Sequence, residues 1–184
     1  MTRATKDFSY HEFAPKGAGK TWMPDSEYQK ILVDVLAENL QVLRNAFGFP
    51  LRITSGVRTL DDYNRLKAAG YNPSETSDHN YGVAVPTSGE KAKKFGPTYN
   101  FTAGAVDIVP IGSSVEHLFD VAVSITRAGK AHFGQVILEM SGKSQWVHLS
   151  NSYEYLFGKT TARFLGKAQF LTSDDGGKTY RTVA

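Results

Sequence analysis

The spacing of apolar residues predicts one long amphipathic helix near the start of the chain. It spans residues 25–47, and its apolar side chains recur every three or four positions: Ile31, Val35, Leu36, Leu40, Leu43 and Phe47. Asp25 or Ser26 is expected to cap the start of this helix, and Gly48 is expected to end it. The apolar stripe predicts that one face packs on a core.

Shorter elements follow from the rest of the pattern. Two more helices are expected at 60–70 and 115–129, and four strands at 51–54, 103–110, 135–140 and 145–150. The last two strands alternate apolar and polar residues and are joined by SGKS, which predicts a hairpin. Because helices and strands alternate irregularly, we expect the α+β class, with a small central antiparallel sheet flanked by helices.

Two loops resemble known motifs. APKGAGKT has Ala14 where a phosphate-binding loop needs glycine, and no apolar strand precedes it, so we interpret it as a plain loop. SDDGGKTY at 173–180 resembles an Asp-box, a hairpin turn that repeats in propeller folds. One copy predicts only a tight C-terminal hairpin, with Asp175 capping the turn and its glycines at positive φ.

Composition narrows the classes of function. Of the 184 residues, 41% are hydrophobic and 21% are charged, which predicts one ordinary globular domain. There is no cysteine, so disulfides and thiolate chemistry are excluded and a transition metal would need His, Asp and Glu. The net charge of +3 comes with no dense basic patch interleaved with aromatics, so no nucleic-acid partner is expected. Membrane insertion is not expected either, because no apolar run approaches about 18 residues.

Five histidines are candidates for a metal or catalytic site. We interpret His11, His117 and His132 as structural, because they lie in a short helical turn, in the first turn of a helix and in a loop. His79 differs because a glycine turn follows it, and His148 because it lies on an alternating strand. These two are the candidate ligands.

The predicted hairpin places a carboxylate on the same face as His148. If SGKS is the turn, Trp146 pairs opposite Glu139, and His148 pairs opposite Ile137. Strand parity then puts Glu139 and His148 on one face, diagonally related and within reach of a shared ion. Asp107 offers a second carboxylate from another strand.

Two histidines and one aspartate form a ligand set that zinc accepts. His79, Asp107 and His148 would leave a fourth position for water, as a catalytic zinc site requires. Zinc lowers the pKa of a bound water to about 7 and polarises carbonyl groups. Glu139 would then be the nearby carboxylate that takes the proton.

The ordered motifs resemble the zinc D-Ala-D-Ala carboxypeptidase family. They are SGVRT, Asn64, S-x-H-x-x-G at 77–82, G-A-x-D-I at 104–108, an apolar strand ending in Glu139, and W-V-H at 146–148. That family includes phage endolysins that cut L-Ala-D-Glu bonds, and it shares a fold with lysostaphin-type peptidases and the hedgehog signalling domain. FSYHEF is similar to the opening of the phage-type branch. The similarity runs from residue 8 to about 150.

The resemblance implies roles for the matching residues. His79, Asp107 and His148 would be the three zinc ligands, and Glu139 would be the general base and acid. The hedgehog/D-Ala-D-Ala peptidase fold is expected to hold them together.

Arg58 and two aromatic residues would bind the substrate. Arg58 would stabilise the oxyanion or hold a substrate carboxylate, because a guanidinium stays charged and offers a planar fork of donors. Taken alone, Arg58 would read as a turn residue that makes surface ion pairs. Trp146 and Tyr81 are the other expected substrate contacts.

The chain departs from the family pattern at two places. The family usually places its first His and its Asp seven residues apart, but the seventh residue after His79 is Pro86, which cannot be a ligand. We therefore expect 86–102 to be an inserted loop or short hairpin at the cleft rim, which either contacts substrate or is simply solvated. Some relatives place Glu three residues before the last His, where this chain has Gln145, so the role of base is expected to fall to Glu139.

These observations predict a single peptidase domain over 1–184. Its core would be about 8–150, with the insertion at 86–102 and a C-terminal hairpin extension at 151–184. The expected activity is zinc-dependent hydrolysis of peptidoglycan stem peptides, of D-Ala-D-Ala carboxypeptidase or L-Ala-D-Glu endopeptidase type, by a phage- or prophage-encoded enzyme. The sequence leaves the cleaved bond and the oligomeric state open.

The N-terminus bears on where such an enzyme would act. MTRATKDFSYHEF has no apolar core for a secretory signal. We therefore expect synthesis in the host cytoplasm and action on the cell wall after release or as part of a virion. The alternative is a catalytically silent module that binds metal and serves as a structural or wall-binding part of a virion.

Overall fold

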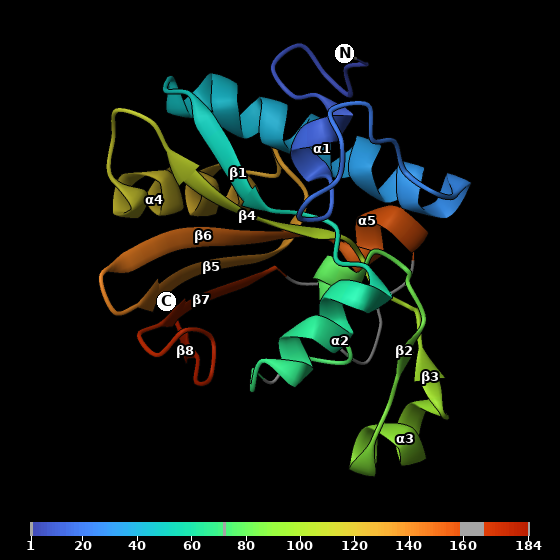
Figure 1. Ribbon diagram of the computed structural model, residues 1–184. Coiled ribbons are helices and arrows are strands. Elements are labelled where there is room, and N and C mark those ends of the chain that lie inside the picture. Colours follow the sequence, from blue (N-terminus) through green and yellow to red (C-terminus); the bar gives the residue numbers. More distant parts are fainter. Residues whose placement is uncertain (1, 72, 159–167, 184) are drawn as a thin grey trace.

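The computed structural model describes residues 2–71, 73–158 and 168–183 and has a mixed α+β architecture (Figure 1). Its centre is a six-stranded sheet of order β1-β4-β6-β5-β7-β8. The strands are β1 (Leu51–Ser55), β4 (Ala105–Pro110), β5 (Phe133–Ser141), β6 (Ser144–Asn151), β7 (Gln169–Ser173) and β8 (Arg181–Thr182). The predicted α+β class is confirmed.

The sheet differs from the prediction at its C-terminal edge. The β1–β4, β4–β6, β5–β6 and β7–β8 pairs are antiparallel, but β7 runs parallel to β5. The expectation of a purely antiparallel sheet is therefore wrong. The reason is that the C-terminal hairpin does not stand apart from the sheet, since β7 pairs along β5 and extends it.

Two helices cover one face of the sheet. α1 (Glu27–Phe47) and α4 (Val115–Arg127) contact each other and the central strands (Figure 1). Ser26 caps α1 by accepting from the Gln29 amide, and Gly48 ends it at φ +82°, as the sequence predicted. Ile31 does not face the core as its spacing suggested, because it is 47% exposed, and Leu32 is fully buried instead.

Side chains of β4 and β6 alternate between the core face of the sheet and the face that carries the candidate site. Val106, Val147 and Leu149 are fully buried in the core beneath the helices. Their neighbours Asp107 and His148 point to the opposite face, because successive side chains of a strand alternate. The pattern that builds the core therefore also places the polar residues together.

Four shorter helical elements belong to the main body besides the two covering helices. They are the 3-10 turns η1 (Tyr10–Phe13) and η2 (Asp78–Asn80), and the helices α2 (Leu60–Ala68) and α5 (Tyr153–Phe157). Ser9 and Glu12 form a capping box at η1. None of the helices in the described ranges has the length and apolarity that a membrane crossing requires.

The predicted insertion forms a small arm. β2 (Val85–Pro86) and β3 (Thr98–Tyr99) pair as a hairpin, and α3 (Gly89–Phe95) lies between them, a helix that the sequence did not predict. Figure 1 shows the arm extending away from the main sheet. Whether it contacts a substrate stays a prediction.

The C-terminal extension is described in two pieces. α5 follows β6, and the predicted hairpin is present as β7 and β8, joined by the Asp-box turn. Residues 159–167 and 184 of the predicted extension lie outside the described residues.

Candidate metal centre

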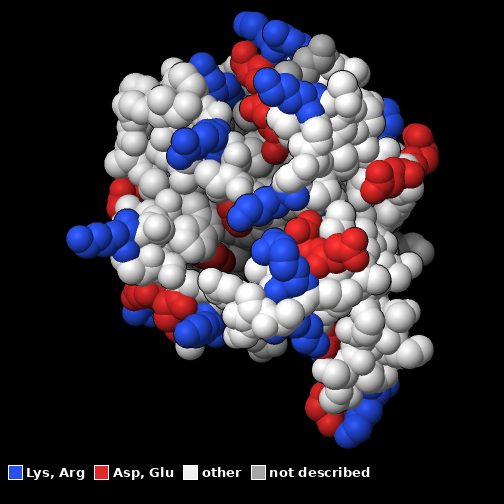
Figure 2. Space-filling view, in the orientation of Figure 1, with Lys and Arg blue, Asp and Glu red and all other residues white. Residues whose placement is uncertain are grey.

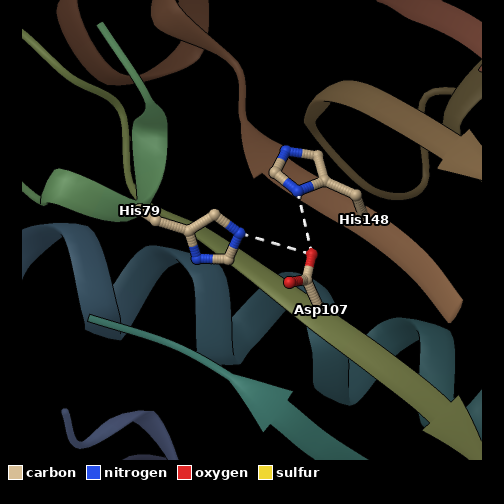
Figure 3. Close-up of side chains that lie close together, drawn as sticks. All are labelled: His79, Asp107 and His148. Carbon is tan, nitrogen blue, oxygen red and sulfur yellow. Dashed lines mark hydrogen bonds and ion pairs between the residues drawn. The ribbon is translucent and has the colours of Figure 1, made fainter. Parts of the chain in front are cut away.

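His79, Asp107 and His148 converge on one point although they are far apart in the sequence (Figure 3). The Oδ1 atom of Asp107 lies 3.3 Å from His79 Nε2 and 3.0 Å from His148 Nδ1. One ligand atom from each residue can be chosen so that all three lie within 4.8 Å of one another. In the described part of the chain this cluster could hold a metal ion, as the sequence predicted.

Strand register explains how two of the three meet. Asp107 on β4 is the direct partner of His148 on β6. Directly opposed residues of antiparallel strands point to the same face, about 5 Å apart at Cβ. Asp107 and His148 are therefore neighbours on the face that α1 and α4 leave uncovered.

A network of hydrogen bonds holds the third residue in place. His79 lies in η2, directly after Asp78. The carboxylate of Asp78 accepts hydrogen bonds from the Ala103 amide at 3.1 Å and from the Tyr153 hydroxyl at 2.9 Å. The carbonyl of His79 in turn accepts from the Arg58 amide at 2.7 Å. These contacts fix the turn beside the start of β4, so the arm at 85–99 is looped out without separating the ligands.

The hydrogen bond that His79 makes to Gly56 favours a cation between His79 and Asp107. His79 Nδ1 lies 2.9 Å from the carbonyl oxygen of Gly56, which can only accept, so Nδ1 carries the proton. In a neutral imidazole, Nε2 then presents a lone pair to the Asp107 carboxylate. Two acceptors at 3.3 Å repel unless a proton or a metal ion lies between them. A backbone carbonyl on the other ring nitrogen is also the usual outer partner of a metal-binding histidine.

The electrostatics of the cluster also favour a positive charge. Burial alone would raise the pKa of Asp107, but the charge of His79 and hydrogen bonds from both histidines hold this pKa well below its usual range. For His148, burial would lower the pKa, but the hydrogen bond and charge of Asp107 outweigh it and raise the pKa. Asp107 is thus an anionic ligand, and a metal ion bound beside it would supply the positive charge that this carboxylate favours.

Glu139 lies beside the cluster, as the hairpin register predicted. Glu139 pairs with Trp146, and Ile137 pairs with His148. Burial raises the pKa of Glu139, and the nearby charge of His148 partly opposes this. Gln145 is placed differently, because its side-chain amide approaches the sulfur of Met140 at 3.1 Å. On a regular strand, residues three apart face opposite sides, so Gln145 does not share the face of His148.

The predicted substrate contacts have different outcomes. Tyr81 is 1% exposed, and its hydroxyl donates to the Ala105 carbonyl at 2.8 Å. This position does not fit the predicted substrate contact, because the ring of Tyr81 is buried in the core. Trp146 is partly exposed beside Glu139, and its role stays a prediction.

Arg58 lines a cavity next to the cluster. The cavity has a volume of about 540 Å³ and includes Gly56, whose carbonyl holds His79, together with Lys16, Asp62 and Arg65. Burial lowers the pKa of the Arg58 guanidinium, and Asp107 and Asp62 oppose that effect. Figure 2 shows basic and acidic side chains around a hollow near the centre of this face.

Two features of the site were missed from the sequence. Asp78 and Tyr153 form the buried anchor of η2, and no pattern in the sequence indicates that these two residues meet. Tyr180, the last residue of the Asp-box, reaches Glu139 with its hydroxyl at 3.4 Å. The sequence predicts only a hairpin turn at the Asp-box, and no local pattern indicates which residue lies against it.

The comparisons with known proteins identify no relative of this chain. No protein-family model, no curated protein and no solved structure matches it at a significant level. The interpretation of the site therefore depends on its geometry and on the motifs quoted above.

Proposed function

We propose that this chain is a zinc-dependent peptidase that hydrolyses peptidoglycan stem peptides, with the hedgehog/D-Ala-D-Ala peptidase-like fold that its motifs suggest. One observation carries the proposal: a His-Asp-His donor set lies on one sheet face with a glutamate beside it that is not one of the three donors. A hydrolytic metal site needs both parts. The phage-type opening FSYHEF favours a phage- or prophage-encoded enzyme.

His79, Asp107 and His148 would hold the zinc ion. When bound there, zinc would supply a Lewis acid and a water molecule of lowered pKa. His79 Nε2 is already turned to the cluster by the Gly56 carbonyl, so this ligand is oriented before the metal binds. The donor types and their mutual distances fit the ion.

Glu139 would move the proton during hydrolysis. Its raised pKa suits a group that accepts a proton from the attacking water and returns it to the nitrogen of the leaving amine. One water molecule is consumed, the C–N bond breaks, and a carboxylate and an amine are released. Arg58 would hold an anionic group of the substrate or the oxyanion that forms during attack.

The cavity beside the cluster supports an acidic peptide as substrate. Lys16 and Arg58 both line it, and the third cation, Arg65, is paired with Asp62 at 3.2 Å. Within the described ranges neither Lys16 nor Arg58 makes an ion pair of this kind, and two such cations around about 540 Å³ suit a peptide segment that carries carboxylates, as stem peptides do.

The test is direct hydrolysis. Purified protein would be incubated with peptidoglycan and with synthetic stem peptides, zinc-loaded or treated with chelator, and the fragments would be identified by mass. We expect fragments that disappear with chelator and in Glu139→Gln. The matched control is His117→Ala, which removes an exposed histidine whose ring lies tilted against that of Phe47, with 5.2 Å between the ring centroids, away from the cluster.

Two results would contradict the proposal. Absence of new fragments under every metal condition would exclude this peptidase activity. Stoichiometric metal binding without hydrolysis would favour the catalytically silent virion module instead.

A further inference from the structure

The C-terminal Asp-box turn sits on the strand that carries Glu139. β7 runs parallel to β5, and Ser173 at the start of the turn is the direct partner of Glu139. The Gly176 amide donates to the Met140 carbonyl at 2.8 Å, one residue after Glu139. The turn is therefore attached to the end of β5 through its backbone.

The turn is internally rigid. Asp175 Oδ1 accepts from the amides of Lys178 and Thr179 and from the Ser173 hydroxyl, each at 2.9 Å. Its Oδ2 accepts from the Thr179 hydroxyl at 2.7 Å, and the Gly177 amide donates to the Ser173 oxygen at 2.9 Å. The position of the next residue, Tyr180, is thus set by a closed set of hydrogen bonds.

The absence of a side chain at Gly177 lets Tyr180 and Glu139 approach each other. Gly177 has φ +81°, and a Cβ atom there would lie 2.8 Å from the Tyr180 hydroxyl and 3.4 Å from Glu139 Oε1. The Tyr180 hydroxyl itself lies 3.4 Å from Glu139 Oε1 and donates to it. Only glycine at 177 leaves room for this arrangement.

The Tyr180 hydroxyl is suited to act as a donor. Burial, together with the charge of Glu139, raises the pKa of Tyr180 to about 12. The hydroxyl therefore keeps its proton at neutral pH, although Tyr180 as a whole is 47% exposed.

We propose that the Asp-box turn is part of the active site and that Tyr180 is a positioning residue, which aims the Glu139 carboxylate at the His-Asp-His cluster. The turn lies outside residues 8–150, over which the family resemblance runs. The inference rests on the proposed function for the role of Glu139 as base, but the contact itself can be tested without activity.

The test uses two variants and a matched control. Tyr180→Phe removes only the hydroxyl, and Gly177→Ala displaces it while keeping the tyrosine. Tyr155→Phe is the control, because Tyr155 is similarly exposed, at 51%, and stacks on His132 instead. The first readout is the side-chain carboxyl ¹³C resonance of Glu139 in the metal-free protein, assigned by its loss in Glu139→Gln.

The expected result is a shift of the Glu139 resonance in Tyr180→Phe and Gly177→Ala, and none in Tyr155→Phe. In the zinc-loaded enzyme, both variants should lower kcat about three- to tenfold, with KM within about twofold and the zinc stoichiometry unchanged. An unchanged Glu139 resonance, or a change in KM alone, would overturn the proposal. If the unaltered protein hydrolyses nothing, the proposed function fails, while the resonance still decides whether Tyr180 positions Glu139.

Discussion

Two aspartates in this molecule are held in the ionised form by different means. Asp107 receives its partners from residues 28 and 41 positions away, on η2 and β6. Asp175 receives its partners from residues two to four positions away, within one exposed turn. The pKa of each carboxyl lies well below its usual range: for Asp175 because of hydrogen bonds from the Thr179 backbone and side chain first, for Asp107 because the two histidines outweigh its burial.

The difference separates a reactive site from a structural one. The donors around Asp175 are mainly backbone amides and hydroxyls, which stay in place at any pH at which the turn is folded. The donors around Asp107 are imidazoles, which exchange protons near neutral pH and also bind metal. Long-range assembly therefore produces a cluster that can take up a cation, whereas local assembly produces a fixed support.

The largest expected effect is on zinc binding, when Asp107, whose partners are distant in the sequence, is replaced. Asp107→Ala should abolish stoichiometric zinc binding, because two histidines alone lack the anionic third ligand. Isothermal titration calorimetry measures this directly. Asp175→Ala is the matched control and should keep its zinc. Retained binding in Asp107→Ala would show that the ligands are assigned wrongly.

Replacing the neighbouring carboxylate should affect turnover and leave the metal in place. Glu139→Gln should lower kcat by about 10²- to 10⁴-fold, because an amide cannot accept the proton. Steady-state hydrolysis of a stem peptide, with zinc content measured by mass spectrometry, gives both numbers. Full activity in Glu139→Gln would mean that another group is the base.

Proton competition should make zinc affinity depend on pH. The pKa of His148 is raised, so below it zinc must displace a proton from this imidazole. The apparent association constant should fall about tenfold for each pH unit below that pKa and level off above it. Titrations in buffers of different ionisation enthalpy count the protons released, and a pH-independent affinity would contradict the assignment of His148.

The stability of the metal-free protein should depend on pH in the opposite direction to its zinc affinity. A raised His148 pKa contributes stability that is present below about pH 6.5 and is lost as the pH rises through the folded-state pKa. A depressed Asp107 pKa contributes stability that is present above about pH 3.9 and is lost as the pH falls through its folded value. The contribution of the cluster to the Tm should therefore be largest between about pH 4 and pH 6.5, and adding zinc should extend it to higher pH.

The smallest expected effect is on hydrogen exchange, when Asp175, whose partners are close in the sequence, is replaced. Asp175→Ala should speed hydrogen exchange of the Lys178 and Thr179 amides, which lose their acceptor, with little change in overall Tm. Asp174→Ala is the control, because Asp174 pairs only with the exposed Arg181 among the contacts described. Equal exchange in the two variants would show that Asp175 does not hold the turn.

Several features followed from the sequence because their causes are local. Ser26 begins α1 through its side chain, and Gly48 ends it through its backbone conformation. The SGKS turn fixes the β5–β6 register that pairs Glu139 with Trp146. The one-residue error at Ile31 arose because apolar spacing defines a stripe, while the neighbouring elements decide which edge of that stripe is buried. The helix in the arm was missed because its seven residues carry no apolar periodicity of their own.

The sequence by itself determined the residue types of the site, the hairpin that pairs Glu139 and Trp146, and the alternation that puts polar residues on one sheet face. Only the tertiary structure decided that Asp107 meets His79 across the arm, that Tyr81 turns into the core, and that Tyr180 reaches Glu139. The physical reason is the range of the interactions. Caps, turns and strand parity depend on residues a few positions apart, whereas these contacts depend on which strands pair and on a buried network around Asp78.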